Sequence, residues 1–161
     1  MSGSTESRGR TMQIITRRRV LVVAHQTADS PELVEAVRRR ASDERCTFAL
    51  LVPAQPHGLH RLVDPEDHGG AEAEARLNAA LPVLSEAAGE PIVGIIGSHE
   101  PFAAIQDALN LMGFDEVIIS MLPARVSRWL HLDLPRKTRA LGVRVTEVVS
   151  TDQRLDEIAA A

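Results

Sequence analysis

The sequence VLVVAHQTADSPELVEAV, residues 20–37, contains the unit from which the fold can be predicted. Its first six residues, VLVVAH, are a valine-rich and almost wholly apolar run that ends at His25, which is typical of a strand buried on both faces of a parallel sheet. Ser30, Pro31 and Glu32 then mark a helix start, with a capping hydroxyl, a proline at the first helical position and an acid in the first turn. Leu33 and Val37 follow at helical spacing. The stretch therefore predicts a strand, a short loop and a helix.

The same alternation continues to the end of the chain. Four more strands are predicted over residues 46–52, 92–96, 116–121 and 143–149. Three more helices are predicted over residues 71–88, 101–112 and about 134–141. Pro82 lies inside the first of these and predicts a kink or two shorter helices. Asp133 is expected to cap the last helix.

Five strands separated by crossovers too long for hairpins predict one α/β domain, with an open five-stranded, mostly parallel sheet and helices on both faces. The length of 161 residues suits a single domain. We expect the domain to span residues 17–150, between a mobile N-terminal tail, residues 1–16, and a C-terminal tail, residues 151–161. The loop from residue 53 to residue 70 is the longest.

Composition argues against several classes of protein. The net charge of −4 and an aromatic content of 2% argue against nucleic-acid binding. No apolar stretch is long enough to span a membrane, and the first ten residues lack the apolar core of a secretory signal. The single Cys46 excludes a disulfide framework. We expect a soluble cytoplasmic protein.

Ligands of open parallel sheets bind outside the carboxyl ends of the strands, where the strand order reverses. This rule selects three residues after the first strand, three after the third, and four at or after the end of the fourth. These candidate ligand-binding residues are His25, Gln26, Thr27, Gly97, Ser98, His99, Ser120, Met121, Arg125 and Arg128.

Residues 20–37 and the stretch DEVIISMLPARVSRWLHLDLPRKTRALGVRVTEVV, residues 115–149, resemble the universal stress protein family. The segment GSHEPFAAI, residues 97–105, fits the junction between the family's third strand and the following helix. Its Gly97-Ser98-His99 also resembles the start of the family's phosphate loop, but by count it follows the third strand and not the fourth. The resemblance implies the Rossmann-like, adenine-nucleotide-hydrolase type of α/β fold and, in some members, ATP binding.

The sequence departs from the ATP-binding members at two places. His25-Gln26 stands where those members carry an acid, and no glycine occurs between Gly113 and Gly142, where they have a glycine-rich loop. Glycines let backbone N–H groups approach phosphates closely. Pro123 removes a donor there, and Asp133 places a carboxylate near the start of the last helix. We expect a non-catalytic binding or regulatory module of the stress response, without ATP or another cofactor.

Two other functions stay open. A nucleotide such as ATP or AMP would use a basic turn in place of glycines, and its members are Arg125, Arg128, His131, Arg136 and Lys137. A hydrolase would use His25, His99 and Ser98, although the chain has no G-x-S-x-G elbow and no acid clearly placed to orient a histidine.

The loop histidines and the last strand complete the candidates. Six loop residues have metal-ligating atoms but lack the paired spacing of a zinc site, so no metal is expected; they are His57, His60, Asp64, Glu66, Asp67 and His68.

The last strand is expected at a sheet edge, and an apolar edge is a liability that proteins cover or pair. The family dimerises through this strand, so we expect a homodimer through Val143, Val145 and Val148.

Overall fold

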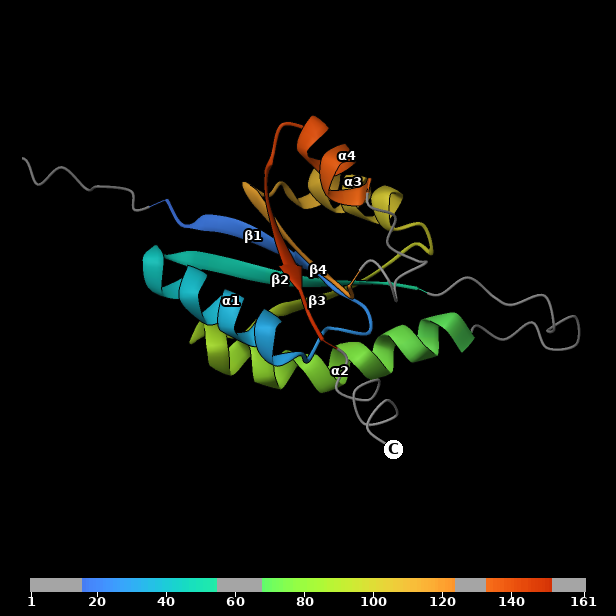
Figure 1. Ribbon diagram of the computed structural model, residues 1–161, viewed down its shortest axis with the longest axis horizontal. Helices are drawn as coiled ribbons and strands as arrows, with labels where there is room; N and C mark the ends of the chain where they lie inside the picture. Colours follow the sequence, from blue (N-terminus) through green and yellow to red (C-terminus); the bar gives the residue numbers. More distant parts are fainter. Residues whose placement is uncertain (1–15, 55–67, 124–132, 152–161) are drawn as a thin grey trace, which may run out of the picture.

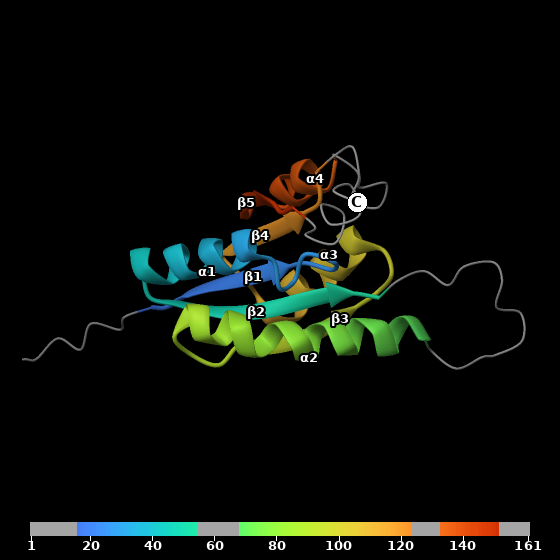
Figure 2. The ribbon, with the colours of Figure 1, turned by 60° about the horizontal axis from the view of Figure 1, so that its bottom comes forward.

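Strand β1 (Arg18–Val23) lies in the middle of a five-stranded sheet with the order β3-β2-β1-β4-β5. The other strands are β2 (Cys46–Pro53), β3 (Val93–Gly97), β4 (Glu116–Met121) and β5 (Arg144–Val149), and every neighbouring pair is parallel. In Figure 2, β2, β1, β4 and β5 follow one another across the sheet. The predicted α/β fold is confirmed, and β5 lies at the edge where it was expected.

The computed structural model describes residues 16–54, 68–123 and 133–151. The predicted tails lie outside these residues except for Thr16 and Thr151, as does most of the long loop. β1 ends at Val23, two residues earlier than predicted, because the chain turns at His25, whose carbonyl accepts a hydrogen bond from the Ala28 N–H.

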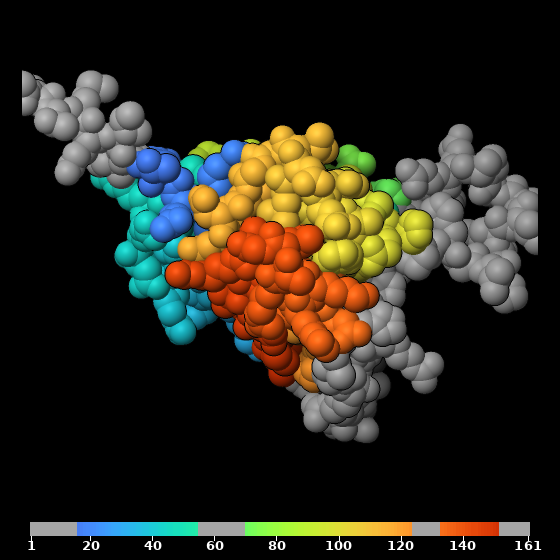
Figure 3. All heavy atoms as spheres, turned by 90° about the horizontal axis from the view of Figure 1, so that it is seen from above, coloured from blue at the N-terminus to red at the C-terminus, as the bar shows by residue number. Residues whose placement is uncertain are grey.

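Two helices cover each face of the sheet. Helices α1 (Pro31–Asp43) and α2 (His68–Ala88) lie below the sheet in Figure 1, and α3 (Pro101–Met112) and α4 (Leu134–Ala140) lie above it. Figure 3 views the second face, where α4 and β5, in orange to red, lie beside α3 in yellow. Each face therefore has its own layer of helices.

The alternation of side chains along β1 divides the core into two clusters. Val20 and Val22 pack with α1 and α2, whereas Leu21 and Val23 pack with α3 and α4. All four side chains are at most 2% exposed. A valine-rich run is therefore buried on both faces, as its composition predicts.

Helix α2 is a single helix of 21 residues, so the prediction of two shorter helices was wrong. Pro82 is exposed; a proline inside a helix lacks a backbone donor, and its ring crowds the carbonyl four residues earlier. A buried stripe runs along both halves of the helix and packs both of them against the sheet. Its members are Ala73, Leu77, Ala80, Leu84 and Ala87.

The caps of α1 and α4 differ. Ser30 Oγ accepts a hydrogen bond from the Leu33 N–H at 3.3 Å, which confirms the predicted start of α1. Asp133 occupies the N-cap position of α4 but its side chain makes no capping bond, so that prediction was wrong. Its backbone is helical instead of extended, and Pro135 in the first turn has no N–H to be capped.

No helix among the described residues is long and apolar enough to cross a membrane.

Candidate functional site

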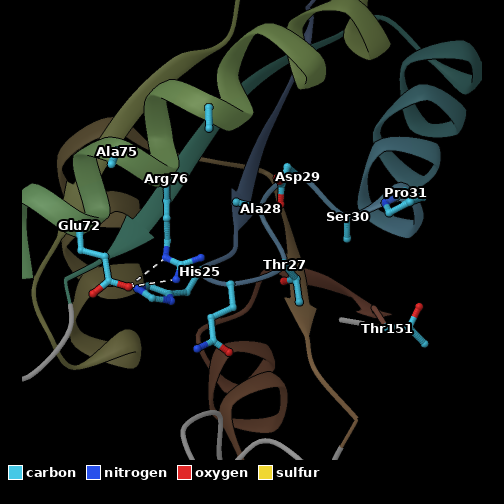
Figure 4. Close-up of a pocket in the computed structure, with 12 residues that line it drawn as sticks. His25, Thr27, Ala28, Asp29, Ser30, Pro31, Glu72, Ala75, Arg76 and Thr151 are labelled. Atoms are coloured by element: carbon cyan, nitrogen blue, oxygen red, sulfur yellow. Dashed lines mark hydrogen bonds and ion pairs between the residues drawn. The ribbon is translucent and has the colours of Figure 1, made fainter. Parts of the chain in front are cut away.

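A pocket of about 490 Å³ lies at the carboxyl edge of the sheet, against the loop that follows β1. Residues 25–31 form one side, and Thr151, two residues after the end of β5, extends it. The opposite wall comes from one side of α2. Figure 4 shows this arrangement, with the α2 residues on one side and the β1–α1 loop on the other. The α2 residues that line the pocket are Glu72, Ala75, Arg76 and Ala79.

His25 forms the buried inner part of this pocket, with only 4% of its surface exposed. Burial first, and the positive charge of Arg76 second, lower the pKa of His25 from 6.5 to about 4, and the negative charge of Glu72 partly opposes this shift. The imidazole is therefore neutral at neutral pH. Arg76 donates two hydrogen bonds, from Nε at 3.2 Å and Nη2 at 3.0 Å, to Glu72 Oε1. Figure 4 shows this pair beside His25.

A chain of four buried hydroxyl groups runs behind the pocket, across the point where the strand order reverses. Ser30 Oγ donates to Ser150 Oγ at 2.8 Å, and Ser120 Oγ donates to Thr27 Oγ1 at 2.7 Å. The two pairs are joined by a 3.0 Å hydrogen bond between Ser120 and Ser150. All four residues are at most 8% exposed. The chain connects the ends of β4 and β5 with the loop after β1 and the start of α1.

The end of β5 is also fixed to α1 by a second contact. The backbone N–H and the hydroxyl of Thr151 both donate to Glu32 Oε1, at 3.3 and 2.7 Å. The Thr151 hydroxyl bond is the largest of the effects that lower the pKa of Glu32. One carboxylate in the first turn of α1 is therefore committed to a contact within the chain.

The structure brings together only part of the predicted site. His25, Gln26 and Thr27 line the pocket, and Ser120 contacts it through Thr27. The Met121 side chain is half-buried against the core beneath α3 and α4, and its carbonyl accepts the Ser150 N–H. The candidates chosen at the end of the first strand thus all line the pocket. The end of the fourth strand contributes through the buried hydroxyl of Ser120.

The candidate residues 97–99, which follow the third strand, lie away from the pocket. β2 separates β3 from β1, and residues 97–99 do not line the pocket. Gly97 is where β3 approaches α3: a Cβ at this position would lie 2.6 Å from the Ala104 Cβ. Ser98 and His99 are exposed, and Ser98 Oγ donates to the Glu100 carbonyl at 3.2 Å. His99 is therefore exposed at the outer strand and does not share a pocket with His25.

The basic turn is only partly described. Arg125, Arg128 and His131 lie outside the described residues, as do all the predicted loop ligands except His68, whose side chain is not described. Arg136 and Lys137 are exposed on α4, and the Lys137 ammonium lies 6.0 Å from the centre of the Phe102 ring. Within residues 16–54, 68–123 and 133–151, no group of three or more histidine, cysteine or acidic side chains could hold a metal ion.

Sequence reasoning missed the wall from α2 and the contributions from the end of β5. Glu72 and Arg76 have the four-residue spacing of a helical ion pair, but that spacing does not say which loop the pair will face. Ser150 was predicted only as the last residue of the domain, and Thr151 as the first residue of the C-terminal tail. Their roles depend on β5 ending beside the start of α1, which only the tertiary arrangement determines.

Comparison with known proteins identifies the fold. Neither a protein-family profile nor a curated protein matches the sequence. Solved structures do match: a universal stress family protein from Burkholderia pseudomallei is 14% identical, with a TM-score of 0.60 over 82% of this chain and 96% of that one. A universal stress protein in complex with cAMP is 16% identical, with a TM-score of 0.54 over 83% and 98%.

A third match is the universal stress protein from Archaeoglobus fulgidus in complex with dAMP. It is 16% identical, with a TM-score of 0.52 over 84% of this chain and 99% of that one. At these identities the likeness concerns the fold. The chain has the α/β fold of the universal stress proteins, as the resemblance in its sequence implied.

Proposed function

We propose that this chain is a universal-stress-protein-like binding or regulatory module that binds a small molecule and does not catalyse a reaction. The observation that carries the proposal is the pocket of about 490 Å³ at the carboxyl edge, a volume typical of small-molecule sites. It lies where ligands of open parallel sheets bind. A cytoplasmic place in the stress response belongs to the same proposal and rests on the sequence and the fold.

The geometry of the hydroxyl groups supports a non-catalytic role. The proposed nucleophile Ser98 donates to a backbone carbonyl at the outer strand, and the buried His25 lies on the far side of β2. Ser120 donates its hydrogen to Thr27 and not to a histidine. A nucleophile must be within hydrogen-bond reach of its base. The Ser98 and Ser120 hydroxyls are each directed at another acceptor, a backbone carbonyl and the Thr27 hydroxyl.

A second candidate is an adenine-nucleotide-binding module. The structures solved with cAMP and dAMP have this fold and favour it. The ligand phosphates would contact the basic turn, through Arg125 and Arg128 together with the exposed Arg136 of α4. The missing glycines and the carboxylate of Asp133 argue against this candidate, and we place it second.

The proposed module is a homodimer that pairs through β5. This strand forms an outer edge of the sheet. The side chains of Val143 and Val145 pack against the core beneath α3 and α4, and Val148 packs against the opposite cluster. The three valines thus hold β5 in place, and the pairing itself would use its backbone and the 58% exposed Val149.

A binding screen tests the proposal. The full chain is titrated with a small-molecule fragment set and with ATP, ADP, AMP and cAMP, read by thermal shift and isothermal calorimetry. We expect fragments that bind, that lose binding in Ala79→Leu, which fills the pocket, and that keep it in Ala71→Leu, a matched change on the same helix outside the lining. Nucleotides should give no shift.

Two outcomes would contradict the proposal. A rise of several degrees with millimolar ATP that Arg125→Ala or Arg128→Ala abolishes would favour the nucleotide-binding candidate. Ester or phosphate-ester hydrolysis by the purified chain that is lost in His99→Ala would favour the hydrolase. A screen without any hit sensitive to Ala79→Leu would remove the pocket as a ligand site.

A further inference from the structure

The buried hydroxyl chain ends at the pocket with one hydrogen that no described group accepts. Each hydroxyl carries a single hydrogen to donate. Ser30 donates its hydrogen to Ser150, and Ser120 donates its hydrogen to Thr27. Because Ser120 has no second hydrogen, the bond between Ser120 and Ser150 must be donated by Ser150. The hydrogen bonds between these four hydroxyls therefore all point in the same direction, toward Thr27. The Thr27 hydroxyl is the last in the series, and no described group accepts its hydrogen.

Thr27 is placed to use that hydrogen on a ligand. It lines the pocket and is 4% exposed, so its hydroxyl has little access to bulk solvent. Figure 4 shows Thr27 between His25 and Thr151 along the loop side of the pocket. Hydrogen bonds in a chain polarise one another, which strengthens the donor at the end. A buried donor of this kind favours an acceptor group on the bound molecule.

The charges around the pocket disfavour an anionic acceptor. Among the lining residues Asp29 and Glu72 are acidic, and the positively charged Arg76 already donates two hydrogen bonds to Glu72. Glu32 adds a carboxylate beside Thr151. Like charges brought together in a pocket cost binding free energy.

The start of α1 does not offset this charge. Pro31 has no N–H, the Glu32 N–H interacts with the Glu32 carboxylate, the Leu33 N–H is taken by Ser30 Oγ, and the Val34 N–H is taken by the Ser30 carbonyl. Anions bind at helix starts through free backbone N–H groups. These positions therefore offer no free donor to a phosphate.

The wall from α2 suits a flat ligand. Ala75 and Ala79 lie one helical turn apart and present two methyl groups to the pocket. Small side chains at this spacing leave room for a ring to lie along the helix, while the polar atoms of the opposite loop meet its edge. The combination of an apolar wall and a few oriented polar groups is typical of ligand sites.

We propose that the pocket selects an uncharged, flat ligand whose carbonyl oxygen or ring nitrogen accepts the Thr27 hydroxyl hydrogen, and that it rejects the phosphate or carboxylate counterpart. This inference rests on the proposed function, because it names the chemical class of ligand for the same pocket. Thr27 is then the specificity-determining donor, and Glu72 sets the charge preference.

Matched pairs of neutral and anionic probes test this. Nicotinamide and nicotinate share one ring and differ in an amide against a carboxylate, and adenosine and AMP differ by a phosphate. Each is titrated against the full chain by calorimetry, with ligand-observed NMR for weak binding. We expect the neutral member of at least one pair to bind, and its anionic partner to bind at least about tenfold more weakly.

Substitutions separate the two parts of the inference. Thr27→Val should weaken the neutral probe by about tenfold and Thr27→Ser should keep its affinity, whereas Thr47→Val on β2, away from the pocket, should have no effect. Glu72→Gln should release Arg76 and strengthen the anionic probe by about tenfold. Glu74→Gln, an exposed position of α2 outside the lining, is its control.

The outcomes distinguish this inference from the proposed function. Binding of the anionic member as tightly as the neutral one, or unchanged affinity in a folded Thr27→Val, would overturn the inference while an Ala79→Leu-sensitive ligand still supports the pocket. If neither pair binds but other fragments do, the inference is again wrong and the proposed function stands. If no compound binds in a manner sensitive to Ala79→Leu, both fail.

Discussion

Arg40 in α1 donates two hydrogen bonds to the carboxylate of Glu116 at the first residue of β4, from Nε at 2.9 Å and Nη2 at 2.8 Å. The Glu116 side chain is 7% exposed and that of Arg40 is 16% exposed. This contact lies at the amino end of the sheet, opposite the pocket. The bond to Arg40 is the main cause of the lowered pKa of Glu116.

Breaking this ion pair should destabilise the fold. Arg40→Ala leaves a buried carboxylate without its main partner, and we expect a loss of about 3 kcal/mol of unfolding free energy, at the low end of the range for buried pairs. Arg144, whose Nη1 lies 3.8 Å from the same carboxylate, limits the loss. Urea denaturation measures it. Arg38→Ala, which removes an exposed pair with Glu35, should cost less than about 0.5 kcal/mol, and equal losses would contradict the assignment.

The same pair predicts a dependence on acid pH. Because the folded pKa of Glu116 is depressed, its stabilisation is complete above the unfolded pKa and is lost as pH falls through the folded value. Stability should therefore fall below about pH 4.5 in the wild type, near the usual glutamate pKa, and fall less steeply in Glu116→Gln. Thermal unfolding measured from pH 7 to pH 3 tests this, and parallel curves for the two proteins would count against it.

Protonation of His25 should affect the folding stability in a different pH range. Its folded pKa of about 4 lies below the ordinary 6.5, so the unfolded chain binds the proton first as pH falls. Stability should then decrease between pH 6.5 and pH 4, by about 3 kcal/mol in total. His25→Gln should flatten this part of the profile. An NMR titration of the His25 ring is the direct measurement, and a midpoint near 6.5 would refute the prediction.

The buried hydroxyl chain should respond to the loss of its central member. Ser120→Ala removes the acceptor of Ser150 and the donor to Thr27, and we expect a loss of about 1–3 kcal/mol. Ser98→Ala, which removes an exposed hydroxyl bonded to a loop carbonyl, is the matched control and should change stability by less than about 0.5 kcal/mol. Chemical denaturation compares the two, and equal effects would show that the chain contributes little.

Gly97 should be the less replaceable of the two glycines in β3. A Cβ at Gly97 would lie 2.6 Å from the Ala104 Cβ and 2.9 Å from Leu51 Cδ1, whereas one at Gly94 would meet only the flexible Leu77 side chain. Overpacking costs about 1–3 kcal/mol where neighbours cannot move. Gly97→Ala should therefore lower the melting temperature more than Gly94→Ala does. The reverse order would mean that α3 shifts freely.

The two edge strands allow a matched test of the proposed dimer. Val149 on β5 is 58% exposed and Val93 on β3 is 57% exposed. Lysine on an edge strand opposes pairing. If the dimer forms through β5, Val149→Lys should yield a monomer by light scattering and Val93→Lys should leave the dimer intact. A wild-type monomer at high concentration would end the proposal, and dissociation only in Val93→Lys would move the interface to β3.

The sequence by itself determined the order of strands and helices, the parallel sheet and the position of β5. Residues 20–23 are apolar at every position, so burial on both faces could be predicted, and the signals around Ser30 indicated where α1 begins. These features depend on neighbours in the chain. The continuity of α2 through Pro82 was not readable in this way, because it depends on packing along both halves of the helix.

The pocket was decided by tertiary structure. The loop at His25 and Thr27 could be selected because a strand end is visible in sequence, but its partners come from the middle of the chain, at Glu72 and Arg76, and from Ser150, 30 residues beyond Ser120. Hydrogen bonds of this kind form only after the sheet brings strand ends together. Local sequence sets each element, whereas the packing of elements decides which polar groups meet.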